Sequence, residues 1–418
     1  MLRVGRAAAA AAAASTAAVA TRAAARRGVA NATGVVGVPN IGKSTLFNGL
    51  VRSQLAQAAN YPFCTVEPNV ALVEVPDPRL AALAALSGSA RTLGWQIEYH
   101  DIAGLIKGAS KGEGLGNAFL GNIRAVNCIL QVVRCFVDPE VLHVMDAPDP
   151  LRDIAVLETE LILADLQSIE KRTVAARGGR ATKTPEGALA ATLLERARVA
   201  LDDGFFASVA GEGLTPAEAA VWPKLQLLTQ KPMMYVCNVG EGDAATGNAM
   251  SDAVKAHVAS RATAYAARAG VPPPDAPALA AAHAVVCAKL EAEAALLPDA
   301  DRAEFLAAYG ITTSGLDAIM RQSARLLRLH TFYTTGPAES HAWCIPVGAS
   351  AVDAAATIHS DFGKAFIRAD IVAYDDYLAC GGEKGAKDAA KVRSEGKDYI
   401  MADGDVAVFR IGNTAGAK

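Results

Sequence analysis

The stretch Gly34-Val-Val-Gly-Val-Pro-Asn-Ile-Gly-Lys-Ser-Thr45 decides the fold of this chain. It contains the pattern G-x-x-x-x-G-K-[ST], with Gly37, Gly42, Lys43 and Ser44 at the required spacing. An apolar β-branched run enters the stretch and a helix-like segment leaves it, which is the context of a phosphate-binding loop. A glycine turn can match such a pattern by chance, but the motifs that follow argue against chance. The sequence therefore predicts a site for a nucleoside triphosphate.

The residue types of this loop suit a triphosphate with its magnesium ion. The glycines allow successive backbone N–H groups to curl around the β-phosphate, and Lys43 reaches the β- and γ-phosphate oxygens. The Ser44 hydroxyl can hold Mg²⁺ at the start of the helix. The loop residues expected to contact the nucleotide are Asn40, Ile41, Gly42, Lys43, Ser44 and Thr45.

Two further motifs follow in the order that a G-domain-type NTPase needs. Asn60-Tyr-Pro-Phe-Cys-Thr65 ends in a threonine that can serve as a second Mg²⁺ ligand. In Tyr99-His-Asp-Ile-Ala-Gly104, Asp101 can support the metal through water, and the Gly104 N–H can meet the γ-phosphate. Alone, such a threonine is usually a capping hydroxyl and such an aspartate a turn residue. Three motifs at these spacings together predict an NTPase.

Two absences bear on the base and on the rate of hydrolysis. The guanine-reading motif Asn-Lys-x-Asp is absent from the sequence, and Asn238-Val-Gly-Glu241 stands in its place after a strand-like run. Hydrogen-bonding groups discriminate strongly between bases, so this change favours ATP at least as much as GTP. Leu105 occupies the position at which Ras-like enzymes carry the glutamine that orients the attacking water. A leucine cannot orient water.

The chain resembles the Obg-like ATPase family, the YchF branch of the Obg group of translation-factor NTPases, over roughly residues 33–412. The segments that carry the resemblance are residues 60–69 (NYPFCTVEPN), 76–79 (PDPR), 101–117 (DIAGLIKGASKGEGLGN), 132–136 (VVRCF), 149–153 (DPLRD), 159–165 (TELILAD), 332–337 (FYTTGP), 358–362 (IHSDF) and 395–400 (EGKDYI). This is far more than a phosphate-loop match alone.

The resemblance implies a base site and an unusual hydrolytic site. Members of the family prefer or accept ATP through the N-x-x-E variant, here Asn238 and Glu241, and the backbone of Val239 would contact the adenine. The last base-contacting segment reads Cys287-Ala288 where the family has serine-like residues, so only a backbone role carries over.

The resemblance also implies roles in hydrolysis and in ion binding for individual residues. The family shares the hydrophobic residue at Leu105, and a histidine proposed to help hydrolysis lines up with His143. An ordinary loop imidazole is an equally good interpretation of His143. Asn40 matches the phosphate-loop asparagine that holds K⁺ in related NTPases of the Obg group.

The pattern along the chain predicts an α/β fold in three parts. A P-loop G domain with a mainly parallel sheet is expected at residues 33–150 and 231–329. A helical hairpin, coiled-coil-like, is expected as an insertion at 151–230, where apolar residues recur at three- and four-residue steps. Its basic tip, residues 171–183, could touch RNA phosphate, although a solvated loop is the commoner outcome. Residues 330–412 resemble a TGS domain, a ubiquitin-like β-grasp module of translation-linked proteins.

Composition limits the partners and the compartment. The chain of 418 residues has a formal net charge of −3, so any nucleic-acid contact must be local. Its seven cysteines are dispersed without a C-x-x-C pair, which indicates buried thiols in a reducing compartment. No stretch reaches the ~18–20 apolar residues that span a membrane.

Residues 1–32 differ from the rest of the chain. They contain five arginines and a long alanine run, and the first acidic residue is Glu67. A basic segment that also carries Ser15 and Thr16 is typical of a mitochondrial presequence, so we expect the mitochondrial matrix. A secretory signal or a low-complexity tail on a cytoplasmic protein are the alternatives.

These observations predict a magnesium-dependent ATPase linked to ribosomes and translation. Lys43 and Mg²⁺ would stabilise the transferring phosphoryl group, but no residue orients the water. A ribosome-bound switch with negligible turnover and a GTPase that uses the same site are the two alternatives.

Overall fold

The computed structural model describes residues 31–58, 69–103, 115–141, 143, 147–176, 184–270 and 282–412. The chain forms two compact units. The larger unit contains Asn31–Glu74 and Ile97–Leu327, and the smaller unit contains Val75–Gln96 and Arg328–Lys418. The sequence prediction assigns residues 75–96 to the nucleotide domain, whereas the structure packs them in the smaller unit. The rest of the predicted division stays a prediction.

The larger unit is built on a sheet with the strand order β2-β4-β1-β5-β6-β7 in the described residues. Its strands are β1 (Ala32–Val36), β2 (Val70–Glu74), β4 (Gln96–Asp101), β5 (Cys128–Cys135), β6 (Met233–Val239) and β7 (Ala282–Val286). From β4 to β7 each strand runs parallel to its neighbour, and every residue of β5 and β6 is buried. A parallel sheet of this kind needs helices on both faces. The predicted α/β class with a mainly parallel sheet is confirmed.

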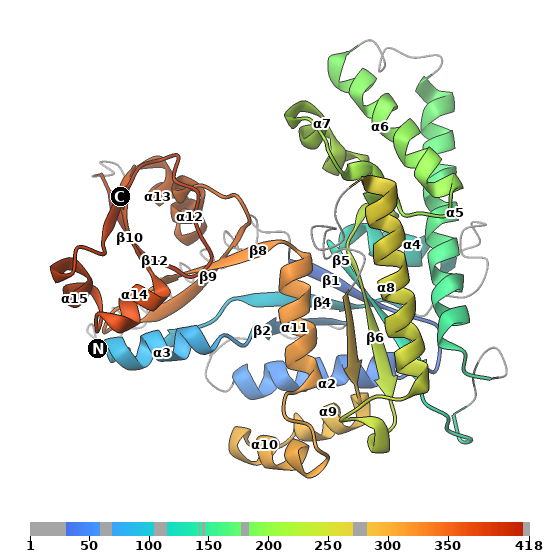
Figure 1. Cartoon of the computed structure of the whole chain (residues 1–418), viewed down its shortest axis with the longest axis horizontal. Coiled ribbons are helices and arrows are strands. Elements are labelled where there is room, and N and C mark those ends of the chain that lie inside the picture. The colour runs from blue at the N-terminus through green and yellow to red at the C-terminus, as the bar shows by residue number, and fades with distance from the viewer. Residues whose placement is uncertain are drawn as a thin grey trace, which may run out of the picture. The chain divides into compact units, whose positions relative to one another are not determined.

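Helices cover both faces of this sheet (Figure 1). One face carries α2 (Lys43–Ala58), α9 (Ala288–Ala294) and α11 (Gly315–Leu326), and the other carries α4 (Leu115–Ala125), α5 (Pro150–Ala176) and α8 (Ala249–Ala269). Gly49 of α2 lies against Leu316 of α11 and Ala292 of α9, so these three helices pack closely on their face. The short α10 (Asp299–Ala308) precedes α11.

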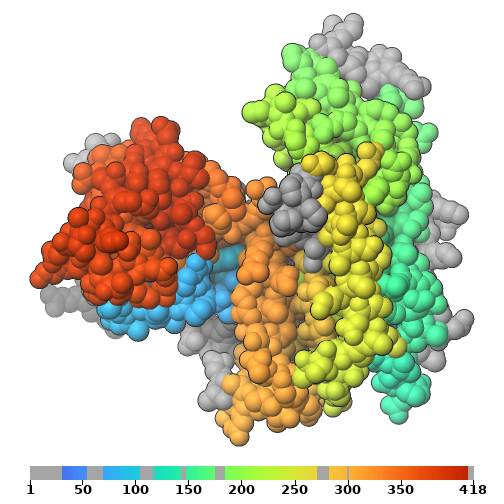
Figure 2. All heavy atoms as spheres, in the orientation of Figure 1, coloured from blue at the N-terminus to red at the C-terminus, as the bar shows by residue number. Residues whose placement is uncertain are grey.

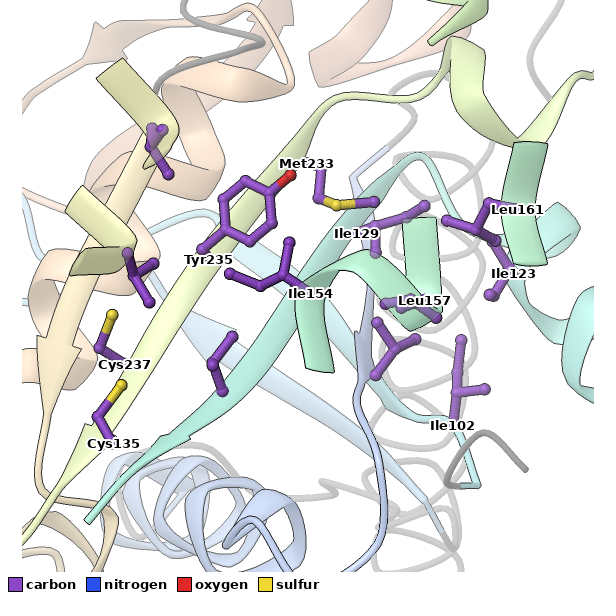
Figure 3. Packing of buried hydrophobic residues seen from close by; sticks show 14 of the residues in the cluster. Ile102, Ile123, Ile129, Cys135, Ile154, Leu157, Leu161, Met233, Tyr235 and Cys237 are labelled. Carbon is purple, nitrogen blue, oxygen red and sulfur yellow. The ribbon is translucent and has the colours of Figure 1, made fainter. Parts of the chain in front are cut away.

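The core on the second face joins the sheet to α4, α5 and α8 (Figure 3). Ile129 on β5 and Tyr235 on β6 pack against residues of α5 such as Ile154 and Leu157, all at most 3% exposed. The free thiols Cys135 and Cys237 are buried in the same core, as expected for cysteines in apolar runs.

The predicted hairpin corresponds to α5 and α6 (Pro185–Asp202), followed by the short α7 (Pro216–Val221). It has a core of its own, in which Ile169 of α5 meets Leu193 and Ala197 of α6. The far end of the hairpin extends past the end of α8 (Figure 2). A buried carboxylate connects the two ends of the hairpin segment. Asp165 of α5 accepts hydrogen bonds at 2.8 Å from the backbone N–H groups of Leu228 and Thr229. The first half of α5 therefore belongs to the sheet core and the second half to the hairpin core.

The smaller unit holds a mixed sheet with the order β11-β10-β12-β8-β9-β3 in the described residues. Its elements are α3 (Pro78–Ser87), β3 (Thr92–Leu93), β8 (Leu329–Thr334), β9 (Ser340–Pro346), α12 (Ala351–Ile358), α13 (Ser360–Lys364), β10 (Phe366–Ala373), α14 (Tyr374–Ala379), α15 (Glu383–Asp388), β11 (Arg393–Glu395) and β12 (Asp405–Ile411). The β8–β9 hairpin is antiparallel, β12 pairs with β8 in parallel, and α12 packs on the sheet. The identification of this unit as a TGS β-grasp module stays a prediction.

Residues 75–96 complete the smaller unit for identifiable reasons. Asp77 caps the start of α3 and accepts a hydrogen bond from Tyr333 on β8. Arg79 reaches Asp403 at 2.7 Å, and β3 adds a parallel strand to β9. These partners lie more than 200 residues away in the sequence, so a local pattern could not reveal them. In the described part of the chain, no helix combines the length and the apolar character that crossing a membrane requires.

The two cores lead to a stability prediction for α5. Leu157 is fully buried, so Leu157→Ala should lower the free energy of unfolding of the larger unit by about 2–5 kcal/mol. Leu163 on the same helix is 42% exposed, so Leu163→Ala is a matched control that should cost less than about 1 kcal/mol. Urea unfolding of both variants measures the difference. Equal destabilisation would contradict the assignment of Leu157 to the sheet core.

Candidate functional site

A cavity of about 620 Å³ opens where β1 and β4 end in the larger unit. The described residues that line it are Val38, Pro39, Asn40, Gly42, Lys43, Ser44, Thr45, Asn69, Asp101 and Ala103. Binding sites of open α/β sheets lie at the carboxyl ends of the strands, as this cavity does. The structure thus brings the predicted phosphate loop and Asp101 to one place.

The loop between β1 and α2 has the backbone conformation that its glycines permit. Gly42 has a φ of 86°, and a side chain there would clash with the Asn238 amide. Asn40 has a φ of 62°, in the left-handed region that asparagine tolerates better than most residues. The helix then starts at once, with the Leu46 N–H donating to the Gly42 carbonyl at 3.0 Å. Ser44 and Thr45 lie exposed in its first turn, where free N–H groups favour an anion.

Lys43 and Asp101 form an ion pair inside the cavity. Their side chains are 11% and 16% exposed, so the pair is largely shielded from water. The sequence predicts a phosphate as the partner of Lys43 and a metal as the partner of Asp101. The structure pairs these two groups with each other, in the cavity where both partners are expected.

Asn238, at the end of β6, connects the phosphate loop to the loop before α9. Its Nδ2 donates to the Ile41 carbonyl at 2.9 Å, and its Oδ1 accepts from the Ala288 N–H at 2.9 Å. The side chain is buried, so both bonds are protected from water. One Nδ2 hydrogen is left for another acceptor, such as a base nitrogen.

The remaining predicted base residues lie near Asn238 along the chain or across the sheet. Val239 is the last, buried residue of β6. Glu241 begins the next turn and forms an exposed ion pair with Lys289 at 2.6 Å. Cys287 is buried at the start of α9, and burial raises the pKa of its thiol. The Ala288 N–H is already used by Asn238, so only other atoms of Ala288 are available to a base.

His143 lies away from the cavity lining and is buried. Its Nε2 is 2.9 Å from Oδ2 of Asp153, which stands in the first turn of α5. The two side chains are 1% and 3% exposed. Burial raises the pKa of Asp153, although the hydrogen bond from His143 opposes that shift. His143 would have to leave this pair before it could reach a nucleotide.

Arg134 is a site residue that the sequence reasoning missed. It lies on β5, is 1% exposed and donates a long bond of 3.4 Å to the Asn40 carbonyl of the phosphate loop. A single charged residue inside the apolar run Val132-Val-Arg-Cys135 is the signal that could have revealed it.

Three predicted residues lie outside the described residues: Thr65, Gly104 and Leu105. Their predicted roles stay predictions.

The chemistry of the remaining oxygen ligands fits Mg²⁺. The Ser44 hydroxyl is exposed at the start of α2, and the Asp101 carboxylate lines the same cavity. Hydroxyl and carboxylate oxygens are the ligands that Mg²⁺ uses beside phosphate oxygens. The described residues contain no group of three or more His, Cys, Asp or Glu side chains that could hold a metal by themselves.

Two protein-family models match the chain. Residues 32–172 match MMR_HSR1, described as "50S ribosome-binding GTPase". Residues 329–412 match YchF-GTPase_C, described as "Protein of unknown function (DUF933)". The first match begins at residue 32 and runs through the phosphate loop into α5.

Curated bacterial proteins are similar over most of the chain. The "Ribosome-binding ATPase YchF" of Haemophilus influenzae is 45% identical over 382 residues, covering 90% of this chain and 98% of that protein. The protein of the same name from Bacillus subtilis is 42% identical, covering 91% and 99%. A solved structure, that of the Schizosaccharomyces pombe YchF GTPase, is similar with a TM-score of 0.76 at 32% identity, covering 92% and 98%.

The contact between Gly42 and Asn238 gives a prediction for the phosphate loop. Gly42→Ala should weaken the binding of ATP with Mg²⁺, because a methyl group there pushes Asn238 away from the loop. Gly204→Ala is the matched control, since Gly204 has a φ of 79° with no atom within 4 Å of an added side chain. Gly204→Ala should lose about 1–2 kcal/mol of stability from its backbone conformation alone, and Gly42→Ala should lose more because of the clash. Only Gly42→Ala should lose ATP affinity in titration calorimetry. Equal ATP affinities in the two variants would contradict this account of the loop.

Proposed function

This chain belongs to the YchF family, and on that premise we propose that it binds and hydrolyses ATP and acts on ribosomes as a nucleotide-dependent regulator. The observation that carries the proposal is the pair of hydrogen bonds made by Asn238. They connect the phosphate loop to the loop expected at the base, which is what a nucleotide site requires.

The phosphate end of the proposed site works through fixed charges. N–H groups of the loop and of the first turn of α2 would surround the β-phosphate, and Lys43 would turn from Asp101 to the β- and γ-oxygens. Asp101, once released, would hold water on the metal, and Ser44 with Thr65 would supply direct oxygens. Mg²⁺, when bound, neutralises charge that develops on the phosphate oxygens.

The base end is proposed to select adenine or to accept it readily. Asn238 keeps one amide hydrogen for the ring, and the Val239 backbone lies next to it at the end of β6. Glu241 replaces the aspartate that reads guanine, and it is held by Lys289. Cys287 and Ala288 would contribute backbone contacts on the other side of the base.

The incomplete hydrolytic site favours slow intrinsic turnover. Leu105 cannot orient water, and His143 is held by Asp153. The orienting group would come from a released His143, from K⁺ bound near Asn40, or from the ribosome. A ribosome-bound switch with negligible turnover is the second candidate function, and the burial of His143 is the observation that favours it.

Ribosome binding is proposed from the names of the relatives, and the hairpin is a candidate contact. Its basic segment begins at the exposed Lys171 on α5. Arg172 there already donates to the Leu225 carbonyl at 2.6 Å, so Lys171 is the more available of the two cations for RNA phosphate.

We further propose that residues 1–32 direct the chain to mitochondria. The family match begins at residue 32, and the basic, acid-free composition of the preceding segment supports a targeting role. A cytoplasmic protein with a low-complexity tail is the alternative.

The choice of base is tested by titrating ATP and GTP against the purified protein with Mg²⁺. ATP should bind at least as tightly as GTP, because the guanine-reading lysine and aspartate are absent. GTP bound tenfold more tightly, a difference of about 1.4 kcal/mol, would favour a GTPase instead. Lys43→Ala should abolish turnover and greatly weaken triphosphate binding. Lys224→Ala, which breaks an exposed pair with Glu186, is the control and should change neither.

The rate of hydrolysis tests the incomplete site. Basal turnover should be slow, on the order of 10⁻⁴ to 10⁻² s⁻¹, and a rate above ~1 s⁻¹ would overturn the idea. K⁺ in place of Na⁺ should raise it, ribosomes should raise it independently, and His143→Ala should lower it at unchanged ATP affinity. Asp153→Ala removes the partner of His143 but keeps the imidazole, so this variant distinguishes loss of the pair from loss of the histidine.

A further inference from the structure

Arg134 is a buried cation whose hydrogen bonds all go to backbone carbonyls. Nη1 donates to the carbonyls of Asn40 at 3.4 Å and Val141 at 2.9 Å, Nη2 to Asp138 at 3.2 Å, and Nε to Phe136 at 3.2 Å. The guanidinium also lies over the Phe136 ring, 4.6 Å from its centre. The planar fork of an arginine is suited to such a set of acceptors.

Arg134 and Asn238 hold two successive carbonyls of the phosphate loop. They are register partners on the adjacent strands β5 and β6. Arg134 binds the Asn40 carbonyl and Asn238 binds the Ile41 carbonyl. In a trans peptide the C=O and the next N–H point in opposite directions. Carbonyls fixed toward the strands therefore turn the N–H groups of Ile41 and Gly42 away from them, where a phosphate can accept.

Among the described residues, the carboxylates that act on the charge of Arg134 are those of Asp138 and Asp153. Burial lowers the pKa of its guanidinium, with Asp138 and Asp153 acting in the opposite direction, but arginine stays protonated in proteins. A buried charge is unfavourable unless it is compensated, and an anion bound at the neighbouring loop would add to the compensation by these two carboxylates. This is a reason for the loop to favour phosphate beyond its own N–H groups.

The other bonds of Arg134 reach the segment that leads to α5. Phe136, Asp138 and Val141 belong to the stretch between β5 and the buried pair of His143 with Asp153. One side chain thus contacts both the phosphate loop and the entry to the helix that forms the hairpin.

We propose that Arg134 is a positioning residue for the nucleotide. It holds the Asn40 carbonyl so that the following N–H groups face the phosphates, and it ties the phosphate loop to residues 136–141 before α5. The inference rests on the proposed function, because it assumes that the loop binds a nucleotide.

The test uses the full chain with Arg134→Lys and Arg134→Met, and titration calorimetry with ATP and with ADP in Mg²⁺. Arg134→Met should bind both nucleotides about tenfold or more weakly, the size expected for losing charge-assisted hydrogen bonds. Arg134→Lys keeps the charge but not the fork, so its loss should be smaller. ATP and ADP should lose affinity by a similar factor, since both carry the β-phosphate.

Arg261→Met is the matched control for general destabilisation. Arg261 also lies over a phenylalanine, Phe206 at 4.8 Å, but its charge is paired with Glu158 at 2.8 Å, far along the chain from the loop. This control should unfold at a lower temperature and keep its ATP affinity when folded. Folded Arg134 variants with wild-type affinity for ATP and ADP would overturn the proposal.

Hydrogen exchange of the wild-type protein tests the same proposal without a variant. ATP with Mg²⁺ should slow amide exchange in residues 136–141 as well as in residues 37–42. If ATP with Mg²⁺ leaves amide exchange at residues 136–141 unchanged, the proposed connection between these residues and the phosphate loop is wrong. This outcome can be read even if neither Arg134 variant folds. A wild-type protein that binds no nucleotide would instead contradict the proposed function.

Discussion

The side-chain amide of Asn238 is the constraint on which the site depends. Its oxygen accepts a hydrogen bond at the start of α9 and its nitrogen donates one to the phosphate loop. One side chain thus holds the two segments that are expected at the two ends of a nucleotide. Both bonds are buried, and a broken bond would leave a polar group without a partner in the interior. Gly42 belongs to the same constraint, since the amide occupies the space of a side chain at that position.

Two opposite charges of the cavity are paired with each other. Lys43 and Asp101 are poorly exposed and neutralise each other, which avoids two uncompensated charges in a half-buried cavity. Under the proposed function, a phosphate would become the partner of Lys43, and a divalent metal would lie near Asp101.

Helix α5 makes the hairpin part of the nucleotide-binding unit. Leu157 packs in the sheet core and Ile169 in the hairpin core, with no break in the helix between them. The helix is uninterrupted from Pro150 to Ala176, so both cores pack on one element. Its first turn carries Asp153, the partner of His143, so the segment after β5 is attached to the same rigid element.

The sequence by itself determined the chemistry that is encoded locally. The spacing of Gly37, Gly42 and Lys43 predicted the phosphate loop, and apolar periodicity predicted α5, because both depend on residues close together in the chain.

Tertiary structure decided the rest. Leu163 fits the helical period yet is 42% exposed, since the hairpin turns a different face inward. His143 lies buried against Asp153, and residues 75–96 join the smaller unit through partners such as Tyr333 and Asp403. Arg134 acquires its acceptors only when β5 lies beside β6 and below the loop. In each case the deciding partner is distant in sequence, and only folding brings it within hydrogen-bonding or packing distance.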